Sequence, residues 1–91
     1  MEFVWDPGKA RKNLAKHRVT FDEARMVFED DLFLAFADPD HSVEEHRFII
    51  MGESKPGRLL VVSYTEGLNS IRIISARKAT RYEQKVFAEE I

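Results

Sequence analysis

Two arginines near the end of the chain have the chemistry and spacing of a phosphate-binding pair. Arg72 and Arg77 enclose the largely apolar run 73–76, and a predicted helix starts just after them. A guanidinium stays charged at any accessible pH and presents a planar fork of N–H donors that matches phosphate oxygens. The structural alternative is an edge strand, in which arginine stems cover apolar surface and the charged heads stay in water. The rest of the chain decides between these interpretations.

Cleavage of RNA is a reaction that such arginines would serve. Without a metal it needs a base for the 2′-hydroxyl proton, cations for the charge on the phosphorane, and an acid for the leaving 5′-oxygen. Histidine can take or give a proton near neutral pH, so His17 is a candidate base or acid. Glu45 and Tyr64 are further candidates for proton transfer or orientation. The predicted catalytic residues are His17, Glu45, Arg47, Tyr64, Arg72 and Arg77.

Several candidates also have a purely structural interpretation, which the sequence leaves open. His17 can cap the C-terminal end of a helix, where a cation complements the helix dipole. Glu45 can pair with Arg47 two residues along one strand, a surface contact worth well under about 1 kcal/mol. Arg77 precedes a helix start, where a cation opposes the dipole, and this favours an anionic partner at that position.

The net charge of −2 conceals three blocks of different sign. Residues 1–19 hold five Lys or Arg against two acids, residues 20–46 hold one against nine, and residues 47–91 hold eight against five. The basic ends could form one face for a polyanion, and the acidic middle could meet a basic partner. Three lysines of the first block, Lys9, Lys12 and Lys16, are predicted to bind RNA.

Composition argues against several classes of protein. The chain has no cysteine, which removes disulfides and thiolate metal sites and fits a reducing, cytoplasmic location. It has no apolar run of about 18 residues and no basic leader, so neither a membrane span nor a signal peptide is expected. Oxygen and imidazole donors gather at 38–46, but their spacing fits no common metal cage. Neither a metal nor another cofactor is predicted.

The pattern of caps and apolar periods predicts the elements that must position these residues. Asp6 and Pro7 suit the cap and the first position of a helix, and Thr20 with Glu23 has the capping-box pattern that starts a second helix. The same pattern recurs at Thr80, before a last helix. The expected helices are 7–16, 20–29 and 81–90, and the expected strands are 32–37, 47–51, 59–64 and 70–75, after a short apolar run at 3–5.

This order predicts one α+β domain over residues 1–91, with the succession β-α-α-β-β-β-β-α and a small antiparallel sheet. Turn residues at 53–57 and 66–69 lie where hairpins between the strands need them. The helices are expected mainly on one face of the sheet. The other face would then be available as a working surface.

An ordered set of residues runs almost from end to end of the chain and has the run Arg-Ile-Ile-Ser-Ala-Arg as its strongest part. The set comprises Trp5, Asp6, Lys9, Asn13, Lys16, His17, Val19, Phe21, Ala24, Val27, Phe28, Asp30, Glu45, Arg47, Gly52, Val61, Val62, the run 72–77, Ala79 and Glu83. With these residues in this order, the chain resembles the BrnT-type toxins.

The resemblance implies an endoribonuclease toxin of a bacterial type II toxin–antitoxin pair, with a RelE-like fold and metal-independent RNA cleavage that inhibits translation. It also implies neutralisation by a ribbon-helix-helix, DNA-binding antitoxin. Arg18 stands where the family usually has Gly, and Phe87 where it often has Tyr. If position 18 needs a positive φ, arginine costs about 1 kcal/mol there. Two alternative functions are a non-catalytic RNA- or protein-binding module on the same fold and a metal-dependent hydrolase that uses the acidic loop.

Overall fold

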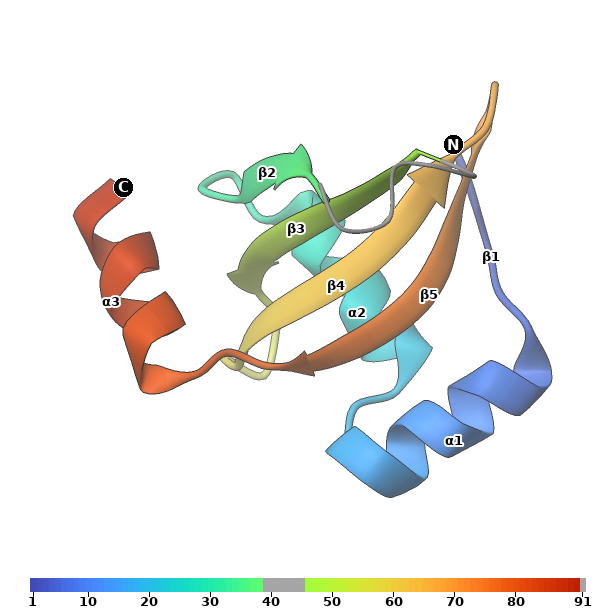
Figure 1. The fold of residues 1–91 in the computed structure, drawn as a ribbon, viewed down its shortest axis with the longest axis horizontal. Helices are drawn as coiled ribbons and strands as arrows, with labels where there is room; N and C mark the ends of the chain where they lie inside the picture. The colour runs from blue at the N-terminus through green and yellow to red at the C-terminus, as the bar shows by residue number, and fades with distance from the viewer. Residues whose placement is uncertain (39–45, 91) are drawn as a thin grey trace.

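The computed structural model describes residues 1–38 and 46–90 of the chain (Figure 1). Strand β1 (Glu2–Val4) leads into helices α1 (Pro7–His17) and α2 (Phe21–Met26), and a 3₁₀ turn η1 (Val27–Glu29) follows α2 directly. Strands β2 (Leu34–Ala37), β3 (Arg47–Glu53), β4 (Leu59–Glu66) and β5 (Ser70–Lys78) come next, and helix α3 (Arg81–Glu90) follows them. The predicted order of elements is confirmed. No helix in these segments is long and apolar enough to cross a membrane.

In the described residues the sheet has five strands in the order β1-β5-β4-β3-β2. β2 to β5 form the predicted antiparallel meander. Hydrogen bonds from Ser54 N to Arg58 O at 3.0 Å and from Gly67 N to Ser70 O at 2.8 Å close two of its hairpins. β1 differs from the expectation of an antiparallel sheet, because it pairs in parallel with β5. A parallel pair needs a crossover connection, and a strand of three residues is too short to indicate a partner so distant in sequence.

The sheet packs on both faces because side chains alternate along each strand. One face, which we call the helix face, carries Ile50 and Val62 and packs against α2. The opposite face carries Met51 and Val61, which form a smaller cluster with Phe87 of α3. Helix α2 packs on the helix face, as predicted, and helix α1 packs against β5. Helix α3 lies at the far end of the sheet from α1 and packs on the opposite face (Figure 1).

Helix α1 starts as its sequence predicts and ends with strain. The Asp6 side chain accepts a hydrogen bond from Lys9 N at 2.8 Å, and Pro7 occupies the first turn. At the other end Arg18 has a φ of 60°, and its N–H donates to Leu14 O at 2.9 Å. This left-handed conformation suits glycine and costs a residue with a Cβ about 1 kcal/mol. The positive φ expected for position 18 is therefore present.

Replacing Arg18 with glycine should raise the free energy of unfolding by about 1 kcal/mol, because glycine reaches this conformation without a Cβ clash. Arg58 Nη2 donates to the backbone carbonyl of Arg18, so the substitution keeps that hydrogen bond. Urea unfolding of the native and variant chains measures the difference. Arg18→Ala is the control, since it removes the guanidinium but keeps the Cβ. Equal stabilisation by both variants would contradict the backbone explanation.

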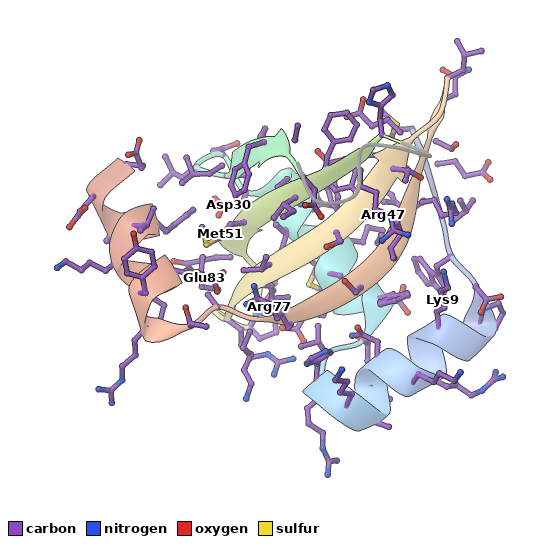
Figure 2. The ribbon with its side chains drawn as sticks, in the orientation of Figure 1. Lys9, Asp30, Arg47, Met51, Arg77 and Glu83 are labelled. Carbon is purple, nitrogen blue, oxygen red and sulfur yellow. The ribbon has the colours of Figure 1, made fainter. Side chains whose placement is uncertain are left out.

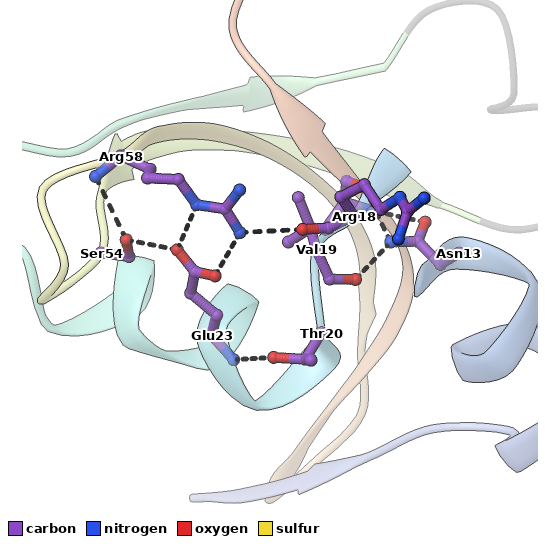
Figure 3. A network of polar contacts seen from close by, with 8 residues as sticks. Asn13, Arg18, Val19, Thr20, Glu23, Ser54 and Arg58 are labelled. Carbon is purple, nitrogen blue, oxygen red and sulfur yellow. Dashed lines mark hydrogen bonds and ion pairs between the residues drawn. The ribbon is translucent and has the colours of Figure 1, made fainter. Parts of the chain in front are cut away.

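Helix α2 begins with half of the expected capping box. Thr20 Oγ1 accepts a hydrogen bond from Glu23 N at 3.0 Å, as predicted. Instead of closing the box, the Glu23 carboxylate accepts from Arg58 Nε at 2.9 Å and from Ser54 Oγ at 2.7 Å (Figure 3). The bond from Arg58 is the main cause that lowers the pKa of Glu23. Since Arg58 Nη2 also donates to Arg18 O at 3.0 Å, the network joins the end of α1, the start of α2 and the β3–β4 hairpin.

Candidate phosphate-binding site

A β-bulge in β5 places Arg72 and Arg77 on the same face of the sheet. The two residues are five positions apart, and in a regular strand an odd separation puts two side chains on opposite faces. The register between β4 and β5 shifts at Ser63 and Tyr64, where β5 has one residue more than β4. This extra residue reverses the alternation. Both arginines therefore project from the face opposite the helix face.

Arg47 lies on the same face as Arg72, in a row that crosses three strands. Arg47 of β3 pairs with Thr65 of β4, and Thr65 pairs with Arg72 of β5. Neighbouring strands are about 4.8 Å apart, so the Cα atoms of the two arginines are separated by about 10 Å. Arg77 lies toward the other end of the sheet (Figure 2). We call the face that carries Arg47, Arg72 and Arg77 the arginine face.

The buried side chain of Asn13 fixes β5 just beyond the bulge. Its Nδ2 donates to Ala76 O at 2.8 Å and to Val19 O at 3.0 Å, and its Oδ1 accepts from Ala76 N at 3.0 Å. β1 pairs with β5 only as far as Arg72, so the amide of Asn13 replaces a neighbouring strand at Ala76. Asn13 thus ties α1 to β5 at the residue before Arg77.

Arg77 is held by a carboxylate from the first turn of α3 (Figure 2). Its Nη1 and Nη2 donate to the two oxygens of Glu83 at 2.7 and 2.9 Å, and Nη1 also donates to Lys78 O at 3.3 Å. Glu83 Oε1 accepts from Thr80 N at 2.8 Å as well, which completes the predicted capping box. The bond from Arg77 is the main cause that lowers the pKa of Glu83 to about 2, and the same bond raises the pKa of Arg77.

The Arg77–Glu83 pair predicts a loss of stability in acid. A carboxyl whose pKa falls on folding stabilises the protein above its unfolded pKa, here 4.5, and this contribution disappears as the pH falls to about 2. Glu83→Gln should therefore lower the free energy of unfolding at pH 7 by about 1–2 kcal/mol, a figure that allows for solvent screening. Urea unfolding along a pH series should show the difference from the native chain shrinking toward zero near pH 2. A difference that stays constant over this range would exclude carboxyl protonation as its cause.

Of the other predicted catalytic residues, the structure describes Tyr64 and His17. Tyr64 is buried on the helix face, with ring centroids 5.6 Å from Phe48 and 5.0 Å from Phe28, and burial raises its pKa. Tyr64 thus lies on the wrong side of the sheet for a shared site. His17 is partly exposed in the last turn of α1, and no hydrogen bond joins it to an arginine in the described part of the chain. Glu45 lies outside the described residues.

The predicted RNA-binding lysines form one stripe on α1. Lys9, Lys12 and Lys16 are exposed, and their spacing of three and four residues puts them on one side of the helix. Because α1 packs against β5, this stripe belongs to the helix next to the strand with Arg72 and Arg77. The segment 38–46 weighed as a metal site lies almost entirely outside the described residues. Within residues 1–38 and 46–90, no group of three or more His, Asp or Glu side chains is arranged to hold a metal ion.

Comparison with known proteins places the chain in a family. Residues 5–83 match the family described as ribonuclease toxin, BrnT, of type II toxin-antitoxin system. The chain belongs to the BrnT family. It is therefore a ribonuclease toxin of a type II toxin–antitoxin system, and the resemblance noted in its ordered residues is confirmed.

A solved BrnT structure has the same fold as this chain. The 1.1 Å crystal structure of the Brucella abortus ribonuclease toxin, BrnT, is similar with a TM-score of 0.66 and 24% sequence identity. The similarity covers 89% of this chain and 99% of that one, which confirms the predicted α+β class. A comparison with curated protein sequences finds no match.

Two residues of this site, Asn13 and Glu83, belong to the ordered set in the sequence, but the sequence alone does not show which groups they bind. The sequence identifies Glu83 only as part of a helix cap, and it predicts no function for Asn13. The odd spacing of Arg72 and Arg77 does carry a signal, because two arginines that serve one phosphate site must share a face and therefore need a bulge between them. No such signal connects Asn13 with Ala76, which is 63 residues away.

Proposed function

We propose that this BrnT-family toxin cleaves RNA without a metal, on the arginine face. The observation that carries the proposal is the placement of Arg47, Arg72 and Arg77 on one face by strand register and by the bulge in β5. In the reaction, the 2′-oxygen of one nucleotide attacks the adjacent phosphorus and the 5′-oxygen of the next nucleotide leaves. The products are a 2′,3′-cyclic phosphate and a 5′-hydroxyl. The arginines stabilise the negative charge that develops on the phosphorane oxygens.

Among the described residues, His17 is the candidate for proton transfer. α1 ends at His17 and packs against β5, the strand that carries Arg72 and Arg77, and an imidazole can take or give a proton near neutral pH. Lys9, Lys12 and Lys16 on the same helix would hold flanking phosphates through charge. Tyr64 is left out of the proposal because it is buried on the helix face.

Incubation of the purified chain with mixed RNA, with and without EDTA, tests the proposal. We expect cleavage in both arms and products that end in a 2′,3′-cyclic phosphate. Cleavage that EDTA abolishes would favour a metal-dependent hydrolase. RNA that stays intact even with ribosomes present, but binds with steep salt dependence, would favour a non-catalytic binding module. Arg72→Ala protein purified in parallel controls for a contaminating ribonuclease.

The neutralising partner in this proposal is a ribbon-helix-helix antitoxin in the cytoplasm. The family description supplies the toxin–antitoxin pairing, and the resemblance of the sequence supplies the antitoxin class. Leu32, Phe33 and Phe36 are exposed at or just before the edge strand β2, and the exposed acids Glu29 and Asp31 precede them. This combination suits a basic, amphipathic segment of the partner. Co-purification from the native operon, with mass spectrometry of the partner, checks this, and recovery of the toxin alone would count against it.

A further inference from the structure

Two glutamate–arginine pairs in this fold have the same parts and different geometry. In each pair a threonine caps the start of a helix, and the glutamate three residues later binds an arginine. The pairs are Glu23 with Arg58 after Thr20, and Glu83 with Arg77 after Thr80. The two pairs differ in which edge of the guanidinium binds the glutamate, and this difference decides whether the arginine has donors left for a ligand.

Arg58 binds its glutamate with the side edge of the guanidinium, formed by Nε and Nη2. Nε donates to Glu23 Oε2 at 2.9 Å, and Nη2 donates to Glu23 Oε1 (Figure 3). Nη2 also donates to Arg18 O at 3.0 Å. The donors of this edge are therefore all engaged within the protein. Arg58 links three elements and has no side edge left for a ligand.

Arg77 binds its glutamate with the end of the guanidinium, formed by Nη1 and Nη2. These atoms donate to Glu83 at 2.7 and 2.9 Å, and Nη1 gives its other N–H to Lys78 O at 3.3 Å. An arginine has five N–H donors, so Nε–H and the second N–H of Nη2 are left. Neither has an acceptor within the described ranges, and the side chain is 41% exposed. The two donors form a side edge that can bind two oxygens of one phosphate.

We infer that Glu83 is a positioning residue, which holds Arg77 so that its Nε–Nη2 edge binds a phosphate of the RNA. This inference rests on the proposed ribonuclease function and names the donor edge within that site. Glu83 is itself fixed, because Oε1 accepts from Thr80 N at 2.8 Å and its own N–H donates to Thr80 Oγ1 at 3.1 Å. The guanidinium is thereby anchored to α3 as well as to β5. A preorganised cation stabilises a transition state better than a mobile one.

The charge of Glu83 gives the inference a distinctive kinetic signature. A carboxylate beside Arg77 opposes the binding of an anion, so Glu83→Gln removes a repulsion as well as an anchor. If Glu83 positions Arg77, kcat should fall about tenfold while KM stays the same or decreases. A purely structural contribution would reduce the amount of folded protein and leave the kcat of the folded fraction unchanged.

Glu23→Gln is the matched control for this experiment, because it changes the same cap position and the same kind of ion pair away from Arg77. At a temperature where circular dichroism shows both variants folded, Glu23→Gln should keep the native kcat. Adding Glu83→Gln to Arg77→Ala should cause no further loss, since Glu83 acts through Arg77. Equal losses in the two glutamine variants, or multiplying losses in the double variant, would overturn the inference.

A measurement without RNA separates this inference from the proposed function. Inorganic phosphate added to the ¹⁵N-labelled chain should move the Nε–H NMR signal of Arg77. The Nε–H signal of Arg58, which is already bonded to Glu23, should stay in place. An unmoved Arg77 signal would overturn the inference even in a chain that cleaves RNA. A moving Arg77 signal in a chain that leaves RNA intact would overturn the ribonuclease proposal and support the anion site.

Discussion

Arg72→Ala and Arg77→Ala should each lower the rate of RNA cleavage about a hundredfold, the scale of losing one preorganised charge stabiliser. Both guanidiniums are on the arginine face only because β5 bulges between them. The loss should appear mainly in kcat, since negative charge grows on the phosphorane in the transition state. Steady-state cleavage of a short defined RNA measures kcat and KM separately.

Substitutions that keep the charge, or that lie elsewhere, sharpen this test. Arg72→Lys keeps the charge and loses the planar fork, so it should recover only part of the lost rate. Arg81→Ala removes an exposed arginine at the start of α3 and should leave the rate near native. Arg77→Ala also leaves Glu83 without its ion pair, so its unfolding must be measured alongside. If both Arg72→Ala and Arg77→Ala cleave RNA at the native rate, the arginine face is not the site of cleavage. A large loss of rate in Arg81→Ala would mean that the losses in the other variants come from the change in net charge.

Signals that act within one turn of the chain predict this fold well. Asp6 and Pro7 start α1, and Thr80 starts α3, where the sequence places them. The hairpins of the meander also follow from local turn residues, because each turn joins neighbouring strands. Even the strain at Arg18 can be anticipated from a position that usually holds glycine.

Contacts between distant parts of the chain are harder to predict. The apolar run at 3–5 does not indicate that β1 pairs in parallel with β5, and an amphipathic α3 does not indicate which face of the sheet it covers. Tyr64 has a phenol suited to proton transfer, but the two-residue alternation along β4 turns it into the core. Leu14 looks like a core residue of α1 and is 45% exposed, whereas the polar Asn13 beside it is buried. The bond partners of Asn13 lie on β5 and in the α1–α2 connection, which no local pattern reveals.

Asn13→Ala should lower the free energy of unfolding by about 2–4 kcal/mol, the largest effect on stability that we expect. It removes three hydrogen bonds and leaves the N–H and C=O of Ala76 and the C=O of Val19 without this partner. A small domain is stable by about 5–15 kcal/mol in total, so the loss should be plain in urea unfolding. Leu14→Ala, at the neighbouring exposed position, is the control and should change stability by under about 1 kcal/mol. A similarly small loss in Asn13→Ala would mean that water replaces the amide.

The same substitution should also slow RNA cleavage by the molecules that remain folded. Asn13 holds Ala76, the residue directly before Arg77. Without Asn13 the end of β5 can shift its register against β4 by one residue. Such a shift turns the side chain of Arg77 from the arginine face to the helix face. Faster amide hydrogen exchange at Ala76, measured under conditions where the variant is folded, should accompany the loss of kcat. A variant that loses stability but keeps the native kcat would show that pairing with β4 alone holds the bulge, and that Asn13 only links α1 to β5.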